Sequence, residues 1–169
     1  MKKNYTRFIV YAAAIAALYA VLTHLQNILL PGSASMAIQM RISEALCVLA
    51  FFTPAAIPGL SIGCLVFNLT FAGTLPLDFL VGTLATYLAA QGMWLTRNRT
   101  VKGYPLLGML LPALTNAILV GWELSVYIGG GFWLNAVYVA IGEAVVLLAL
   151  GTALYYGLKR RSLAEKLFS

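Results

Sequence analysis

The acidic side chains of this 169-residue chain are few, and most of them interrupt apolar segments. They are Glu44, Asp78, Glu123, Glu143 and Glu165, and the single histidine is His24. Charged side chains within a bilayer cost a few kcal/mol each, and they normally face the interior of a helix bundle or a water-filled cavity. If the apolar segments span a membrane, these residues therefore favour binding of a ligand with positive charge or several hydrogen-bond donors.

The spacing of the polar residues groups them on shared helix faces. Arg41 lies three residues before Glu44, and side chains at this spacing are neighbours on a helix. Asn116 and Glu123 are seven residues apart and also share a face. Glu143 lies about eleven residues into the last expected helix, roughly 16 Å deep at 1.5 Å per residue, and this depth favours a binding role. The residues expected to line an outward-opening recess are Arg41, Glu44, Asn68, Asp78, Asn116, Glu123 and Glu143, with Trp122 and Trp133 as aromatic walls.

Several of these residues also have a structural alternative. Asp78 could cap the helix that it begins, a position that aspartate favours. Glu123 and Trp122 could lie at the membrane interface, exposed to water and headgroups. Arg41 and Glu44 could form a structural ion pair.

Two patterns resemble reactive sites but favour packing. Residues 59–63 match G-x-S-x-G, but the nucleophile elbow of that motif needs a strand-to-helix turn. The same residues spell G-x-x-x-G, which brings membrane helices close together. Cys47 and Cys64 lie in apolar runs without a C-x-x-C partner, so we interpret them as buried packing residues. We expect neither a metal site nor a cofactor.

The composition indicates a single integral membrane domain that covers residues 1–169. The chain is 62% apolar and 9% charged, with a mean hydropathy of +0.90, whereas soluble domains carry roughly 25% charged residues. A helix needs about 20 residues to cross a bilayer. The apolar run that starts at Phe8 is too long for a signal-peptide core, so we expect it to be retained. Apolar windows and helix breakers predict helices near 8–28, 40–53, 56–72, 77–96, 104–126 and 132–158.

The basic residues predict the topology, because cytoplasmic loops near span ends are rich in lysine and arginine. One long helix over 44–72 would place the basic residues of 97–102 on the opposite side from the N-terminus. A turn at Thr53-Pro54 instead places all three clusters on one side, which predicts six spans with both termini cytoplasmic. The clusters flank apolar spans and lack interleaved aromatics, so they favour a lipid surface over nucleic acid. They are Lys2, Lys3 and Arg7; Arg97, Arg99 and Lys102; and Lys159, Arg160, Arg161 and Lys166.

Small residues line the first expected helix. They are spaced by four in two rows, Ala12, Ala16 and Ala20 in one row and Ala13 and Ala17 in the other. Such spacing allows close helix packing in membranes. The partner could be another helix of this chain, which is the commoner case, or another subunit.

Three motifs together resemble the queuosine-precursor transporter family. They are Arg41-Ile42-Ser43-Glu44-Ala45-Leu46; Gly59-Leu60-Ser61-Ile62-Gly63-Cys64, which leads to Asn68; and Asp78-Phe79-Leu80-Val81-Gly82-Thr83 with Ala85-Thr86. The resemblance covers nearly the whole chain in length and number of spans, while its distinctive motifs lie between residues 39 and 86. Members of that family are the substrate-binding S components of energy-coupling factor (ECF) transporters.

The resemblance implies a binding subunit with six helices in a bacterial cytoplasmic membrane. Such a subunit takes up a micronutrient from outside and docks onto a transmembrane coupling subunit that carries two cytoplasmic ATPases, so we do not expect an enzyme. The implied docking surface is the set of small residues Ala12, Ala13, Ala16, Ala17 and Ala20, and residues 29–39 would form a lid.

The resemblance also implies a 7-deazaguanine ligand such as queuine or its aminomethyl precursor. One carboxylate can accept both donors of a guanine-like edge, a second can bind a cationic arm, and an aromatic ring can stack on the base. The expected roles are Glu143 or Glu123 at the donor edge, Asn116 and Asn68 as amide partners, Trp122 or Trp133 for stacking, and Glu44, Asp78 and Arg41 as further contacts.

Two alternatives remain open. The chain could be an S component for another cationic or aromatic micronutrient. It could also be a small proton-linked carrier or an intramembrane enzyme, because buried carboxylates serve proton relays. The single histidine and the lack of an internal repeat argue against this last class.

Overall fold

The computed structural model describes residues 5–33, 40–71 and 73–160, and within them the chain is almost entirely helical. Besides the helices, the described residues contain one isolated bridge between Val101 and Tyr104. The helical elements are α1 (Tyr5–Leu29), η1 (Ile42–Phe51), α2 (Ala56–Thr70), α3 (Asp78–Thr96), α4 (Leu106–Met109), α5 (Leu111–Tyr127), α6 (Phe132–Val146), η2 (Leu147–Gly151) and α7 (Thr152–Arg160).

These elements form the six predicted helical segments, because α4 continues into α5 and α6 continues through η2 into α7. The predicted break at Thr53-Pro54 is confirmed, since η1 ends at Phe51 and α2 begins at Ala56. Proline lacks the N–H that a continuing helix needs. Three segments are long and apolar enough to cross a membrane, namely Tyr5–Leu29, Leu106–Tyr127 and Phe132–Arg160.

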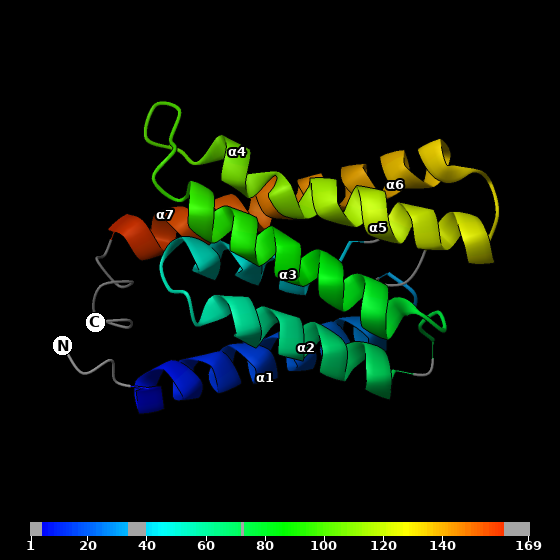
Figure 1. Ribbon diagram of the computed structural model, residues 1–169, viewed down its shortest axis with the longest axis horizontal. Coiled ribbons are helices and arrows are strands. Elements are labelled where there is room, and N and C mark those ends of the chain that lie inside the picture. Colours follow the sequence, from blue (N-terminus) through cyan, green and yellow to red (C-terminus); the bar gives the residue numbers. More distant parts are fainter. Residues whose placement is uncertain (1–4, 34–39, 72, 161–169) are drawn as a thin grey trace.

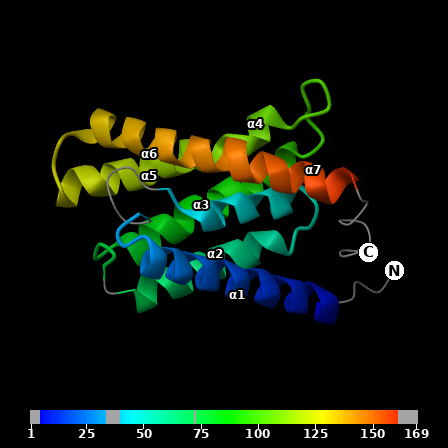
Figure 2. The same ribbon diagram turned by 180° about the vertical axis from the view of Figure 1, so that it is seen from behind.

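The outer helices pack in a row around η1. Along the outside, α1 packs on α2, α2 on α3, α3 on α5, and α5 on α6. The short helix η1 contacts α1, α2, α3, α6, η2 and α7, and so occupies the centre of the bundle (Figure 1). The first residues of α1 and the last of α7 lie at one end of the bundle, together with the loop between α3 and α4 (Figure 2).

We call this end the basic end, because it carries Arg7, Arg97, Arg99, Lys102, Lys159 and Arg160. The other end, where α2 leads to α3 and α5 leads to α6, is called the acidic end. The common placement of the basic segments agrees with the positive-charge pattern of the sequence. The cytoplasmic orientation of the basic end stays a prediction.

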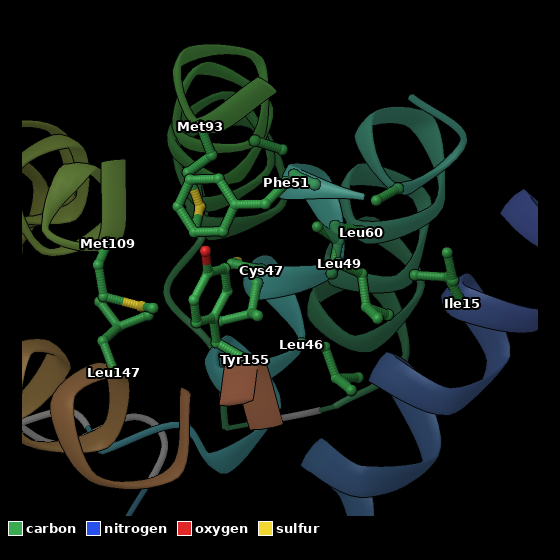
Figure 3. Packing of buried hydrophobic residues seen from close by; sticks show 14 of the residues in the cluster. Ile15, Leu46, Cys47, Leu49, Phe51, Leu60, Met93, Met109, Leu147 and Tyr155 are labelled. Carbon is green, nitrogen blue, oxygen red and sulfur yellow. The ribbon is translucent and has the colours of Figure 1, made fainter. Parts of the chain in front are cut away.

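The central helix η1 is apolar because it is surrounded on all sides. Residues Ser43–Phe51 are all buried, and Glu44 is the charged residue among them. Cys47, Leu49 and Phe51 pack among side chains from other helices, including Met93 and Tyr155 (Figure 3). The helix has 3-10 geometry, so its ten residues extend roughly 20 Å at about 2.0 Å per residue. Both cysteines are buried and free.

The glycine pair in α2 allows α1 to approach closely. A Cβ at Gly59 would lie 2.8 Å from the backbone oxygen of Ala12, and one at Gly63 would lie 2.7 Å from that of Ala16. The segment is helical throughout, so the G-x-x-x-G interpretation holds and the nucleophile elbow is excluded.

The expected docking surface on α1 needs correction. Ala12, Ala16 and Ala20 are buried within this chain, and the first two face the glycines of α2, so these three are not available to another subunit. Ala13 and Ala17 are exposed on the opposite face. Residues 34–39 of the expected lid lie outside the described residues.

Substitution of Gly63 tests this packing. We expect Gly63→Ala to lower the free energy of unfolding by about 1–3 kcal/mol, because the added methyl group overpacks the interface with α1. The measurement is thermal unfolding of the detergent-solubilised protein. Gly157→Ala is the matched control, because nothing lies within 4 Å of a Cβ at that helical position. Equal stability of the two variants would contradict the close contact.

Candidate functional site

The polar residues expected to line a recess are all buried. They come from the start of η1 and from α2, α3, α5 and α6. They are Arg41, Glu44, Asn68, Asp78, Asn116, Glu123 and Glu143, each with at most 5% of its surface exposed.

Arg41 lies between α2 and α3 and neutralises one carboxylate. Its Nη2 lies 3.4 Å from Oδ2 of Asp78, and its guanidinium lies 5.7 Å from the centre of the Phe67 ring. Asn68 braces the same corner by donating a hydrogen bond of 2.7 Å to the backbone oxygen of Asp78. The ion pair at this corner therefore joins Arg41 to Asp78.

Close backbone approach makes this corner possible. A Cβ at Gly82 would lie 2.8 Å from Nδ2 of Asn68 and 3.0 Å from Oδ1 of Asp78, so glycine leaves room for both side chains. The N-cap of α3 is Leu77 rather than Asp78. Oδ1 of Asp78 has no hydrogen-bond partner among the described residues, which argues against the capping alternative.

Glu44 has both carboxylate oxygens occupied. Oε1 accepts a hydrogen bond from the hydroxyl of Tyr19, and Oε2 accepts one from Sγ of Cys47 at 3.1 Å. Tyr19 is completely buried, so α1 fixes the position of this carboxylate. Beside it, Thr23 donates to Ser43 at 2.7 Å.

Gln26 joins α1 to both described ends of the loop that precedes η1. Its Nε2 donates to Oγ of Ser33 at 2.9 Å and to the backbone oxygen of Met40. Its Oε1 accepts from the backbone N–H of Ile42 at 2.7 Å. One amide side chain thus positions the residues on either side of Arg41.

These contributions from α1 were not predicted, although the sequence contains a signal for them. Tyr19, Thr23, Gln26 and Asn27 follow at helical spacing, and all four are buried. They continue the face of the buried alanines toward the acidic end. The periodicity that defines the alanine row therefore also marks the inward face of α1.

Other carboxylates of the cluster contrast with Glu44, because they retain unpaired oxygens. Buried polar atoms are normally hydrogen-bonded, so each exception calls for an explanation. Every one of these atoms can accept a hydrogen bond. Together with the amide oxygen of Asn68, the carboxylate oxygens without a partner among the described residues are Oδ1 of Asp78, Oε1 and Oε2 of Glu123, and Oε2 of Glu143.

The unpaired carboxylates belong to one electrostatic group. Glu143 interacts with the charges of Glu44 and Arg41, and Glu123 interacts with those of Asp78 and Arg41. The structure therefore brings together acids that are almost a hundred residues apart in the chain. Asn116 is buried on α5 in the same helix as Glu123.

A short loop joins α5, which carries Glu123, to α6, which carries Glu143. Its three glycines, Gly129, Gly130 and Gly131, have φ values of +87°, +80° and +84°, which other residues rarely adopt. Asn135 secures the turn by donating to the backbone oxygen of Gly129 at 2.8 Å.

The two tryptophans proposed for stacking lie on the outside of the bundle. Trp122 is 49% exposed and Trp133 is 80% exposed, so the structure does not bring them together with the buried carboxylates. The aromatic ring beside Arg41 is that of Phe67, which is buried. Among the described residues, no three histidine, cysteine or acidic side chains gather as metal ligands.

Comparison with known proteins identifies the family. The family model described as QueT transporter matches residues 9–160. The chain belongs to the QueT transporter family. No solved structure matches it.

A curated relative supports this assignment over part of the chain. The "Queuosine precursor transporter QueT" of Lactococcus lactis subsp. cremoris (strain MG1363) is 39% identical over 89 residues, which are 51% of this chain and 48% of the relative. The matched region thus spans about half the length of the relative. Membership of the QueT family and the apolar helices together indicate a multi-pass membrane protein.

Substitution of Tyr19 tests how this QueT family member holds Glu44. We expect Tyr19→Phe to lower the free energy of unfolding by about 1–3 kcal/mol, because it leaves a buried carboxylate oxygen without its donor. Thermal unfolding in detergent measures the change. The control is Tyr87→Phe, at a tyrosine that is 44% exposed. Unchanged stability of Tyr19→Phe would show that the hydrogen bond contributes nothing.

Proposed function

We propose that this QueT family member is the substrate-binding S component of an ATP-driven ECF uptake transporter for a queuosine precursor, either queuine or 7-aminomethyl-7-deazaguanine. The observation that carries the proposal is the set of buried oxygens without donors on Asn68, Asp78, Glu123 and Glu143. A ligand that supplies several N–H donors would satisfy them. The matched relative, whose name refers to a queuosine precursor, supports this ligand class.

The chemistry of a 7-deazaguanine base fits such a site. Its N1–H and exocyclic amino group are adjacent donors that one carboxylate can accept together, and its aminomethyl arm is a cation near neutral pH. The ring carbonyl needs a donor, which the amides of Asn68 or Asn116 or the guanidinium of Arg41 could supply. The ring of Phe67 stacks on Phe71 and lies beside Arg41, so its faces are engaged within the protein.

The proposed role as a subunit rests on the lack of a built-in source of energy. The sequence contains no G-x-x-x-x-G-K-[ST] loop for nucleotide phosphates. Two cytoplasmic ATPases and a transmembrane coupling subunit would therefore drive uptake across the bacterial cytoplasmic membrane. For docking on the coupling subunit, α1 offers the exposed residues Ala13 and Ala17.

A binding titration of the purified protein tests the ligand class. We expect the wild type to bind 7-aminomethyl-7-deazaguanine and queuine more tightly than guanine. Glu123→Gln should weaken binding on the order of ten- to hundredfold, because it removes a charged acceptor from a buried site. Ser125→Ala, at a partly exposed position two residues further along α5, is the control and should bind as the wild type does.

The outcome that contradicts the ligand class is a wild type that binds none of these bases. Mass spectrometry of a ligand that co-purifies would then identify another micronutrient. The role as a subunit has a separate test in vesicles that contain this chain alone. Uptake driven by a pH gradient without ATPases would instead support a proton-linked carrier.

A further inference from the structure

The loop between α3 and α4 contains a tight hairpin at the basic end. Val101 and Tyr104 exchange both of their backbone hydrogen bonds, at 2.9 and 3.1 Å. Lys102 and Gly103 at its tip have φ values of +51° and +79°, the left-handed pair that a type I′ turn requires. Such positions favour glycine, asparagine or aspartate. The hairpin instead carries a lysine there, with its side chain exposed.

Polar and aromatic contacts hold this hairpin against α7. The hydroxyl groups of Tyr104 and Thr152 form a hydrogen bond of 2.6 Å, and the ring of Tyr104 stacks on that of Tyr156 with centres 6.0 Å apart. Nζ of Lys159 donates to the backbone oxygen of Gly103 at 3.1 Å, a contact between residues 56 positions apart in the chain. The fold therefore joins two separate basic segments at one end of the bundle (Figure 2).

We call residues 99–104 and 156–160 together the hairpin surface. Its exposed basic residues are Arg99, Lys102, Lys159 and Arg160. Each acidic residue in the described part of the chain is buried, with at most 3% exposed, and the ion pair found there is that of Asp78 with Arg41. Within the described residues, no carboxylate therefore balances the charge of the hairpin surface, and an anion from outside the bundle would do so.

Exposed apolar side chains adjoin these basic residues. Val101 in the hairpin is 61% exposed, Leu107 shortly after it is 56% exposed, and Tyr156 on α7 is 48% exposed. A phospholipid offers a charged headgroup and apolar chains to such a mixed surface, and a soluble anion offers charge alone. Basic clusters beside membrane spans attract anionic lipids. The composition of the hairpin surface therefore favours an anionic lipid over a soluble anion.

We propose that the hairpin surface binds the headgroup of an anionic phospholipid. Lys102 from the hairpin and Arg160 from α7 supply positive charge from two segments, while Val101 and Tyr156 contact the acyl chains. Bound lipid would add to the contacts that hold the hairpin on α7. The proposal concerns the surface at the basic end and does not depend on which ligand the protein transports.

Thermal unfolding of the purified protein in detergent tests the proposal. The probe is phosphatidylglycerol, and phosphatidylcholine with the same acyl chains is the reference lipid. Each protein is scored by the rise in its unfolding midpoint with the first lipid minus the rise with the second, so the intrinsic stability of a variant cancels. The wild type should score about 3–6 °C with phosphatidylglycerol at about ten times its dissociation constant. Equal shifts with the two lipids would overturn the proposal.

Single substitutions locate the binding surface. Lys102→Asn removes the charge at the tip but keeps a residue type that the left-handed turn accepts, and it should lower the score by about half or more. Arg160→Gln should do the same from α7. The matched control is Arg7→Gln, which removes the same charge from α1 at the same end of the bundle and should keep the score of the wild type.

The pattern across the variants decides the outcome. Equal losses in Lys102→Asn, Arg160→Gln and Arg7→Gln would mean that the lipid responds to the total charge of the basic end, and unchanged scores in the first two would place the lipid elsewhere. Either result overturns the proposed surface.

A last measurement separates a lipid from a soluble anion. Inorganic phosphate added alone should leave the unfolding midpoint unchanged, because it cannot contact the apolar part of the surface. A rise as large as that with phosphatidylglycerol would assign the surface to a soluble anion and overturn the lipid proposal.

Discussion

The structure depends on the cost of burying carboxylates inside a helix bundle that lies in a bilayer. A charge at that depth must be paired, hydrated or reserved for a ligand. Within one cluster, this chain pairs some of its carboxylates and leaves others without a partner among the described residues. Arg41 pairs with Asp78, and Tyr19 and Cys47 satisfy Glu44, while Glu123 and Glu143 retain oxygens without partners among the described residues.

The central position of η1 makes this cluster possible. A short helix in the middle of the bundle lets residues from the surrounding helices reach a common interior. Its first turn carries Glu44, directly after Arg41. The remainder is apolar and packs in the hydrophobic core (Figure 3). The helix η1 therefore has a charged first turn in the polar cluster, and its remaining residues belong to the hydrophobic core.

Much of the fold could be predicted from the sequence, because hydropathy and the distribution of lysine and arginine are strong signals in membrane proteins. The boundaries of all six segments fall within a few residues of the expected ones, and the turn at Pro54 follows from proline chemistry. The 3-10 geometry of η1 and the π-helical turn η2 were not predictable, because tertiary packing sets them and local composition does not.

The burial of the polar residues could be predicted from the sequence, but their pairing could not. Burial of the polar residues follows from the cost of exposing them to lipid. Which acid Arg41 would meet could not be derived, because spacing along one helix suggested Glu44, whereas the ion pair crosses to α3. The exposure of Trp122 and Trp133 could not be predicted, because a large aromatic suits the membrane interface as well as a binding site, and both lie on the surface of the bundle.

The three glycines between α5 and α6 limit how this protein can diverge. Surface loops generally tolerate substitution and insertion, but each of these positions has a left-handed backbone that side chains other than glycine rarely adopt. Sequence drift in this hairpin is thus confined to the helices on either side. Substitutions on α5 and α6 can alter ligand preference, while the glycine turn maintains the geometry of the helical hairpin.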